Sequence, residues 1–354
     1  MKKRRILLQY PGDIEKALFD PAGRDGCTEP FIRLRAALES AGYVIEPPTR
    51  AALKDAAWLL FWDVPSATNA HGVRGALRRL KQGFAERTRN WLKEAREAGL
   101  ERVGVMLWEP ATVCAANWSR DVYEQFKIVL TWDDTIVDDV RIHKMLFPIP
   151  EKWPAIAPVP YHEKKLLVNI SSNKLSNHPG ELYSSRVEAI RYFERTYPRD
   201  FDLFGHGWDA APTPIGDARG WLPRPKPDFI EYESFRGTVP SKSAVLPRYR
   251  FALCYENSGD QPGYVTEKIF DVMRCGCVPI YLGAPNVTDY VDQGAFIDRR
   301  SFSSHAELSE FLARMTEAEH DTYLRSIARY LTSDRFAQFT SGRFVERLVS
   351  VLDL

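Results

Sequence analysis

The sequence predicts an α/β protein built from two halves, each with a parallel sheet flanked by helices. Short apolar runs of strand length alternate with helix-like segments through both halves. One stretch, 251–282, shows the strand, helix, strand order of a βαβ unit. Between the halves lies a proline-rich stretch, 147–161, which cannot continue a helix or a central strand and is therefore expected to be the linker.

The first half begins with the apolar run Arg5–Gln9, which predicts a first strand. Thr28 is a candidate N-cap for a helix that ends at Gly42. This helix would place one apolar face toward a core, made of Phe31, Leu34, Leu38 and Ala41. Three later apolar runs predict further strands, over Ala57–Trp62, Val103–Trp108 and Ile128–Trp132.

The second half is expected to start with a strand near Leu166. Within 251–282 we expect a strand over Phe251–Tyr255, a helix from the N-cap Thr266 to the stop at Gly276, and a strand over Val278–Leu282. A long loop is expected over 207–247, which is rich in proline and glycine, and helices after Phe296. The predicted domains are 1–155 and 156–335, followed by a final helix over 336–354.

Polar residues gather where the first strand of the βαβ unit ends and its helix begins. Glu256 and Asn257 follow the strand, and Tyr264, Glu267 and Lys268 surround the helix start. In open parallel sheets, ligands bind beyond the carboxyl ends of the strands. A lysine in the first helical turn is unfavourable beside the positive end of the helix dipole, unless an anion binds there. The pattern predicts a phosphate site, and the alternative is an ordinary solvated helix start with Tyr264 as packing.

The segments YENS, GYVTEKI and VPIYLGAP, in this order, resemble the signature of the bacterial type of α-1,3-fucosyltransferases, glycosyltransferase family ten. The resemblance implies a GT-B fold of two Rossmann-like domains facing a cleft, in which the final helix often crosses back to the first domain. It implies inverting transfer of L-fucose from GDP-β-L-fucose to a glycan hydroxyl, expected to be α-1,3 on a GlcNAc-type residue. It places Asn257 near the fucose, Tyr264 and Lys268 on the diphosphate, Glu267 on the ribose, and Glu256 in the same donor site.

Two upstream segments extend the resemblance. In 165–193 it places Ser172 and Asn173 in a loop of the donor site and Arg186 on the pyrophosphate. Arginine suits this role because its planar fork can bind two phosphate oxygens. In RVGVMLWEP it aligns Glu109 with the catalytic base. Partial burial beside Trp108 would raise the pKa of such a carboxylate toward the working pH.

Composition limits the partners. A net charge of +1 argues against nucleic acid as the main partner, because no excess of Lys and Arg is available; the basic cluster Arg74–Lys81 is expected to be a solvated face. The five cysteines lack metal-site spacing and are expected to be reduced. No apolar stretch is long enough to span a membrane. We expect a cytoplasmic bacterial enzyme, with peripheral membrane association left open, that requires no cofactor; Mn or Mg would be stimulatory at most.

Three other functions remain open from the residues. A metal-dependent GT-A-like transferase would use Asp200 and Asp202, which form an Asp-x-Asp motif. A dinucleotide oxidoreductase is disfavoured, because Gly12 has no G-x-G-x-x-G motif around it. A non-catalytic nucleotide-sugar binding protein could keep every donor-site residue without a working base. The residues alone do not identify the acceptor, and they do not show a preference for guanine in the donor.

Overall fold

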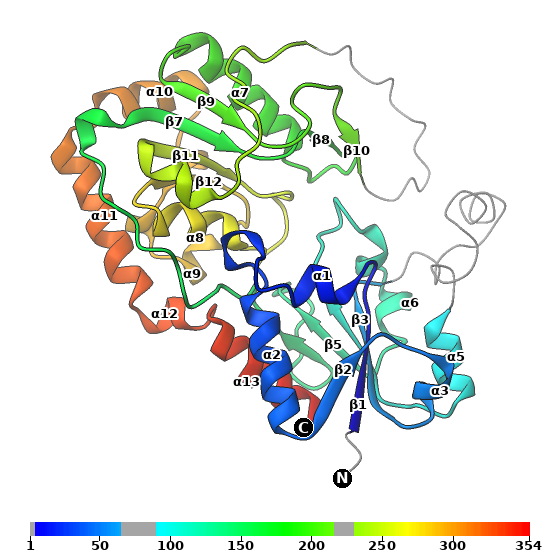
Figure 1. Ribbon diagram of the computed structural model, residues 1–354. Helices are drawn as coiled ribbons and strands as arrows, with labels where there is room; N and C mark the ends of the chain where they lie inside the picture. The colour runs from blue at the N-terminus through cyan, green and yellow to red at the C-terminus, as the bar shows by residue number, and fades with distance from the viewer. Residues whose placement is uncertain (1–3, 65–89, 216–229) are drawn as a thin grey trace. The chain divides into compact units, whose positions relative to one another are not determined.

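The structure, a computed structural model, describes residues 4–64, 90–215 and 230–354 (Figure 1). The chain forms two compact units. The N-terminal unit contains Met1–Gly23, Cys27–Leu146 and Ser341–Leu354, and the C-terminal unit contains Arg24–Gly26 and Phe147–Thr340. The final helix thus belongs to the N-terminal unit. The basic cluster Arg74–Lys81 lies outside the described residues.

The N-terminal unit contains a parallel sheet of six strands in the order β2-β1-β3-β4-β5-β6. The strands are β1 (Arg4–Gln9), β2 (Tyr43–Glu46), β3 (Ala56–Trp62), β4 (Val103–Leu107), β5 (Ile128–Thr131) and β6 (Ile142–Lys144). The four strands predicted from the sequence in this half are confirmed to within one residue. The edge strands β2 and β6 were not predicted, because their short runs lack the continuous apolar character of a central strand.

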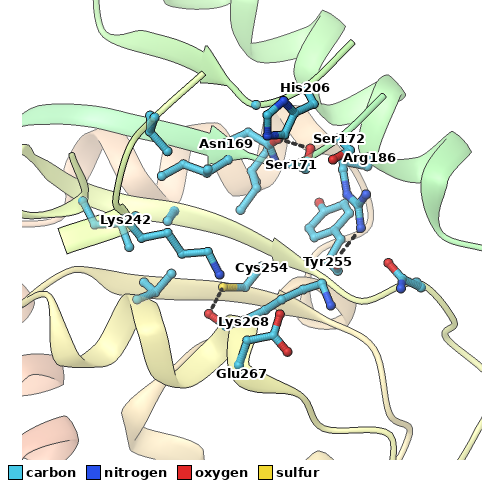
Figure 2. Close-up of a pocket in the computed structure, with 18 of the residues that line it drawn as sticks. Asn169, Ser171, Ser172, Arg186, His206, Lys242, Cys254, Tyr255, Glu267 and Lys268 are labelled. Atoms are coloured by element: carbon cyan, nitrogen blue, oxygen red, sulfur yellow. Dashed lines mark hydrogen bonds between the residues drawn. The ribbon is translucent and has the colours of Figure 1, made fainter. Parts of the chain in front are cut away.

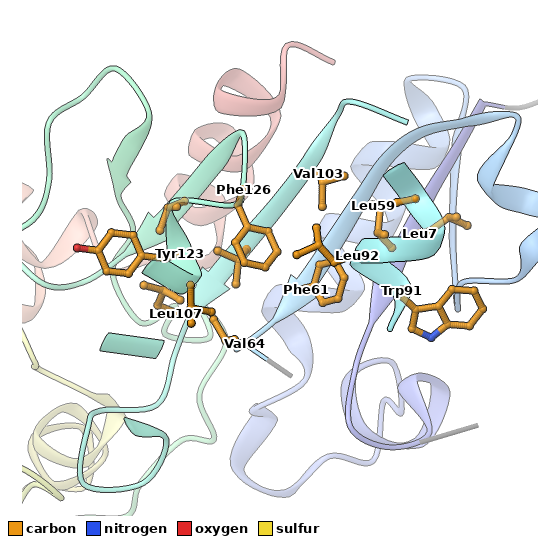
Figure 3. Packing of buried hydrophobic residues seen from close by; sticks show 14 of the residues in the cluster. Leu7, Leu59, Phe61, Val64, Trp91, Leu92, Val103, Leu107, Tyr123 and Phe126 are labelled. Carbon is orange, nitrogen blue, oxygen red and sulfur yellow. The ribbon is translucent and has the colours of Figure 1, made fainter. Parts of the chain in front are cut away.

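The helices of this unit are α1 (Ile14–Leu18), α2 (Glu29–Ser40), α3 (Arg50–Leu53), α5 (Trp91–Glu97), α6 (Arg120–Tyr123), α13 (Ser341–Leu352) and the 3₁₀ helix η3 (Ala115–Trp118). Figure 3 shows part of the core, where Trp91 and Leu92 of α5 and Tyr123 of α6 pack with apolar residues of β1, β3 and β4. Thr28 is the N-cap residue of α2, as predicted, but its side chain makes no capping hydrogen bond. Its hydroxyl instead donates to the Asp20 carbonyl (2.7 Å).

The C-terminal unit contains a parallel sheet of five strands in the order β13-β12-β11-β7-β9. The strands are β7 (Lys165–Ile170), β9 (Phe201–Phe204), β11 (Tyr249–Tyr255), β12 (Val278–Leu282) and β13 (Ile297–Asp298); β8 (Lys174–Leu175) and β10 (Thr213–Pro214) form a separate pair. The strands β11 and β12 pair in parallel with Phe251 opposite Val278, which confirms the predicted βαβ unit.

The helices of this unit are α7 (Tyr183–Thr196), α8 (Glu267–Arg274), α9 (Val287–Tyr290), α10 (His305–Arg314), α11 (Glu317–Leu331) and α12 (Asp334–Ala337). Its 3₁₀ helices are η1 (Arg24–Gly26), η4 (Tyr161–Glu163), η5 (Lys242–Ala244), η6 (Leu246–Arg248), η7 (Gln293–Ala295) and η8 (Arg299–Ser301). Thr266 is the N-cap of α8, as predicted, and its side chain accepts from the backbone N–H of Lys268. Among the described helices, none has both the length and the apolarity that a bilayer crossing requires.

Candidate functional site

A cavity of about 270 Å³ lies in the C-terminal unit, at the carboxyl ends of β7 and β11 (Figure 2). The residues after β7 supply Ser171 and Ser172, the start of α7 supplies Arg186, and the start of α8 supplies Glu267 and Lys268. Each of these elements presents its polar residues at this edge because the strands are parallel and each helix begins where a strand has ended. The cavity therefore collects charged groups from distant parts of the sequence.

Lys268 has a counter-ion already built into the protein. Its ammonium group lies 2.9 Å from Glu256 Oε2, and the Glu256 side chain is 0% exposed. Burial alone would lower the pKa of Lys268, but the carboxylates of Glu256 and Glu267 outweigh it and raise the pKa. The backbone N–H and the hydroxyl of Thr266 also donate to Glu256, each at 2.9 Å. Glu256 thus holds the lysine, charged, at the helix start.

A second ion pair lies one turn further along α8. The ammonium group of Lys242 contacts Asp271 Oδ2 (2.5 Å), and both side chains are largely buried. Burial raises the pKa of Asp271 to about 6. Burial would also raise the pKa of Glu267, but Lys268 and Lys242 outweigh it and lower the pKa. Glu267 is therefore an ionised hydrogen-bond acceptor on the cavity wall, which suits a sugar hydroxyl.

Arg186 is buried, with 4% exposure, and lines the same cavity as Lys268. Its Nη2 donates to the carbonyl oxygens of Tyr255 (2.6 Å) and Glu256 (3.1 Å). Among the described residues, these bonds use one of its three nitrogens, so the rest of the guanidinium can bind an anion. Figure 2 shows Arg186 and Lys268 at the same side of the cavity. The structure thus places the predicted arginine and lysine in a common pocket.

The other predicted donor-site residues divide into two groups. Ser172, Asn257 and Glu267 line the cavity. Glu256, Tyr264 and Asn173 are not among the described residues that line the cavity. Tyr264 is buried, and its hydroxyl accepts from Asn257 Nδ2 (3.3 Å). Asn173 donates through Nδ2 to the carbonyl oxygens of Gly207 and Ala210, both at 3.0 Å, and so holds a loop in place.

Other lining residues were not predicted as part of the site, among them Asn169, His206 and Lys242. His206 is exposed at the cavity. Lys242 is partly buried, with a side-chain exposure of 16%. A lysine in a loop rich in proline and glycine gives no sequence signal of burial, because its contact with Asp271 is tertiary.

Glu109 belongs to the N-terminal unit, where it follows β4 at the carboxyl end of the strand. The Asp63 carboxylate, at the end of β3, accepts from the backbone N–H groups of Trp108 (2.7 Å) and Glu109 (3.0 Å) and from Asn117 Nδ2 (2.6 Å). Burial raises the pKa of Asp63, and these hydrogen bonds oppose that effect. Sequence reasoning did not identify Asp63, which fixes the backbone at Glu109. The role of Glu109 as a base remains a prediction.

The second aspartate of the Asp-x-Asp motif, Asp202, is bound by other side chains of the protein. The Asp202 carboxylate contacts Lys165 Nζ (2.6 Å) and Arg236 Nε (2.8 Å) and accepts from the Tyr249 hydroxyl (2.6 Å). Its side chain is 4% exposed. Among the described residues there is no cluster of three His, Cys, Asp or Glu side chains that could hold a metal ion. These partners occupy the oxygens that a hard cation would need.

Comparison with known proteins agrees with the predicted family. Residues 232–332 match the model described as Glycosyltransferase family 10 (fucosyltransferase) C-term. An alpha-(1,4)-fucosyltransferase of Arabidopsis thaliana is 41% identical over 156 residues, which are 44% of this chain and 35% of that protein. The alpha-(1,3)-fucosyltransferase FucT of Helicobacter pylori is 35% identical over 74 residues, 21% of this chain and 15% of that protein. The matches thus span about a third or less of these relatives.

Solved structures support the fold. A crystal structure of an alpha1,3-fucosyltransferase aligns with a TM-score of 0.57 at 14% identity and covers 99% of this chain and 90% of that chain. A crystal structure of alpha1,3-fucosyltransferase with GDP-fucose aligns with a TM-score of 0.52 at 14% identity, with the same coverage. The predicted GT-B class, with a parallel sheet and flanking helices in each unit, is confirmed.

Proposed function

Because residues 232–332 match the model of the C-terminal part of the family-ten fucosyltransferases, we propose that this chain is a glycosyltransferase that moves L-fucose from GDP-β-L-fucose to a glycan hydroxyl. One observation carries the proposal. Lys268, Arg186 and the first turn of α8 share a single cavity in the C-terminal unit, beside the ionised Glu267. This arrangement suits a nucleoside diphosphate, with the phosphates at the cations and the ribose at Glu267.

In the proposed reaction, an acceptor oxygen attacks the anomeric carbon of the fucose. The bond from that carbon to the β-phosphate oxygen breaks, and its electron pair leaves with GDP. Arg186 and Lys268 stabilise the growing negative charge, because both are held in place before the ligand binds. Removing one preorganised donor of this kind typically costs about 2.7–4 kcal/mol of transition-state stabilisation. Attack from the face opposite GDP inverts the anomeric configuration and gives an α-linked product.

Glu109 is the proposed base that takes the proton from the acceptor hydroxyl. A positioned base typically contributes about 10²- to 10⁴-fold in rate. Asp63 would support this role indirectly, because it binds the backbone N–H of Glu109 and so fixes where the side chain starts. We further propose an α-1,3 linkage to a GlcNAc-type residue, in a bacterial cytoplasmic enzyme. These finer assignments rest on the family resemblance.

Two of the alternative functions can be compared with the structure. A metal-dependent reaction at Asp200 and Asp202 is disfavoured, because Lys165, Arg236 and Tyr249 occupy the Asp202 carboxylate. A non-catalytic nucleotide-sugar binding protein would share the whole cavity with the enzyme. The difference between enzyme and binder therefore lies in turnover.

Two measurements test the proposal. In a thermal-shift screen of nucleotide sugars, we expect GDP compounds to raise the melting temperature more than UDP compounds do. Incubation with GDP-β-L-fucose and a GlcNAc-terminated glycan should release GDP and yield an α-fucosylated product, identified by its anomeric NMR signal. Preference for UDP compounds would contradict the donor, and binding of GDP-fucose without release of GDP across a panel of glycans would favour the binding protein.

A further inference from the structure

The cavity has two chemically different ends. Arg186 and the ammonium group of Lys268 lie at one side, and Lys242 reaches in from the other (Figure 2). The lining of the cavity also includes four buried apolar side chains, Val239, Leu246, Ala252 and Val272, besides polar residues such as Arg24. If the phosphates occupy the end with Arg186 and Lys268, the end with Lys242 is left for the less polar part of the ligand.

Helix geometry gives the order of groups along α8. Asp271 and Val272 follow Glu267 and Lys268 by four residues, so they lie about one turn, or roughly 6 Å, further along the helix. The ammonium group of Lys242 is fixed at Asp271 (2.5 Å). A ligand with its phosphates at Lys268 and its ribose at Glu267 would therefore place its base near Val272 and Lys242.

Lys242 is held at both ends. Its backbone N–H donates to both carboxylate oxygens of Asp25 (3.0 and 3.2 Å), and the preceding Ser241 hydroxyl donates to Asp25 as well (2.5 Å). Asp25 belongs to the same unit as the cavity and is in the left-handed backbone region (φ 54°). At the other end, Asp271 binds the ammonium group. A long, flexible side chain is thus restricted to one direction before any ligand binds.

Neighbouring carboxylates keep the Lys242 side chain protonated. Burial alone would lower the pKa of Lys242, but Asp271 and Glu267 outweigh it and raise the pKa. An ammonium group has three N–H donors and no acceptor. Among the described residues Asp271 takes one of these donors, so two remain for a ligand in the cavity.

Resting on the proposed function, we propose that Lys242 is the residue that selects the base of the donor, and that it favours a purine with an oxygen at ring position 6. Guanine presents two adjacent acceptors, O6 and N7, which suit an ammonium group, whereas adenine presents an amino donor at position 6. The apolar side chains that line the same cavity would cover the flat faces of the ring. Guanine and hypoxanthine fit this arrangement, and adenine leaves the ammonium group facing another donor.

Calorimetric binding of GDP, IDP, ADP and UDP to the full chain tests the proposal. For the wild type we expect GDP and IDP to bind about 10-fold or more tightly than ADP, as a good pair of donor contacts to one base provides. Lys242→Met should weaken GDP and IDP binding by about 10-fold or more and leave ADP binding unchanged. Lys242→Arg, which keeps the donors, should retain the preference for GDP.

Two further variants separate base recognition from a structural role. Lys242→Met leaves Asp271 buried without its partner, so Lys242→Met/Asp271→Asn removes both charges and restores a neutral site. This double variant should still bind GDP no better than ADP. Lys165→Met is the matched control, because Lys165 pairs with the buried Asp202 (2.6 Å) and does not line the cavity. It should keep the wild-type preference.

Each other outcome overturns the proposal. Equal weakening of all four nucleotides in Lys242→Met would assign Lys242 to the phosphates. Unchanged GDP binding, or recovery of the GDP preference in the double variant, would leave Lys242 a structural role only. Wild-type protein that prefers UDP, or that binds no nucleotide, would refute the proposed function itself, a result that the wild type alone distinguishes from a failure at Lys242.

Discussion

The clearest test of the candidate site is Lys268→Met, which removes the ammonium group and keeps the length of the side chain. Lys268 has two roles that the structure separates. It faces the cavity, where it would stabilise the departing diphosphate, and it neutralises Glu256, which is 0% exposed. The substitution should therefore reduce both turnover and stability, and for different reasons.

The size of each effect follows from the contacts. Breaking a buried ion pair by removing one partner typically costs about 3–5 kcal/mol. Glu256 keeps two donors from Thr266, each at 2.9 Å, so we expect the loss of folding stability to lie at the lower end, about 3 kcal/mol. The loss of one preorganised donor to the diphosphate should reduce kcat by about 10²- to 10³-fold.

A second substitution separates these effects. In Lys268→Met/Glu256→Gln the buried carboxylate becomes a neutral amide, whose oxygen can still accept from Thr266. Urea unfolding should show that this variant regains most of the lost stability, while a GDP-release assay should show that its turnover stays as low as in Lys268→Met. Lys268→Arg serves as the control that retains the charge. Wild-type turnover in Lys268→Met, or recovery of turnover together with stability in the double variant, would refute the role of Lys268 in leaving-group stabilisation.

Three further predictions concern other parts of the molecule. Glu109→Gln should reduce turnover by about 10²-fold or more and leave GDP affinity within twofold, as measured by initial rates and calorimetry; normal turnover would exclude Glu109 as the base. Gly205→Ala should unfold the protein or prevent its expression, because its φ is 129° and a Cβ atom would lie 1.8 Å from the Ser171 carbonyl oxygen, whereas Gly237→Ala, at φ 87° with nothing within 4 Å, should cost only about 1 kcal/mol or slightly more in urea unfolding. Activity should persist after dialysis against EDTA, since Asp202 is occupied by protein groups; complete loss that only Mn or Mg restores would revive the metal-dependent alternative.

The central strands and α8 were predictable because their signals are local. The run at 251–255 is apolar enough for a strand buried on both faces, and Thr266 is followed directly by a helical pattern. The edge strands β2 and β6 were missed, because a strand with one neighbour can be short and partly polar. Thr28 was correctly placed at the N-cap of α2, but the sequence did not show that its hydroxyl donates to the carbonyl of Asp20, which lies eight residues away in the sequence.

The candidate site was predictable only in part, for a related reason. Lys268 could be assigned to the helix start from spacing alone, but its partner was expected to be a bound anion. The structure supplies Glu256 instead, twelve residues earlier, through a contact that depends on how β11 and α8 pack together. Lys242 and Asp63 were missed for the same cause, since each is functionally placed by a tertiary contact, to Asp271 and to the backbone at Glu109.

The counter-ions around the cavity explain how several cations can be kept charged and in place for the different parts of a nucleoside diphosphate. A cluster of buried, unpaired cations would repel one another and lose their charge by desolvation. Here Glu256 balances Lys268, Asp271 balances Lys242, and the carbonyl groups at the end of β11 bind Arg186. Each of these partners occupies only some of the donors of its cation. The remaining donors are oriented before the ligand arrives, so a nucleoside diphosphate would find its hydrogen bonds without reorganisation of the protein, which is the condition under which such groups stabilise developing charge most strongly.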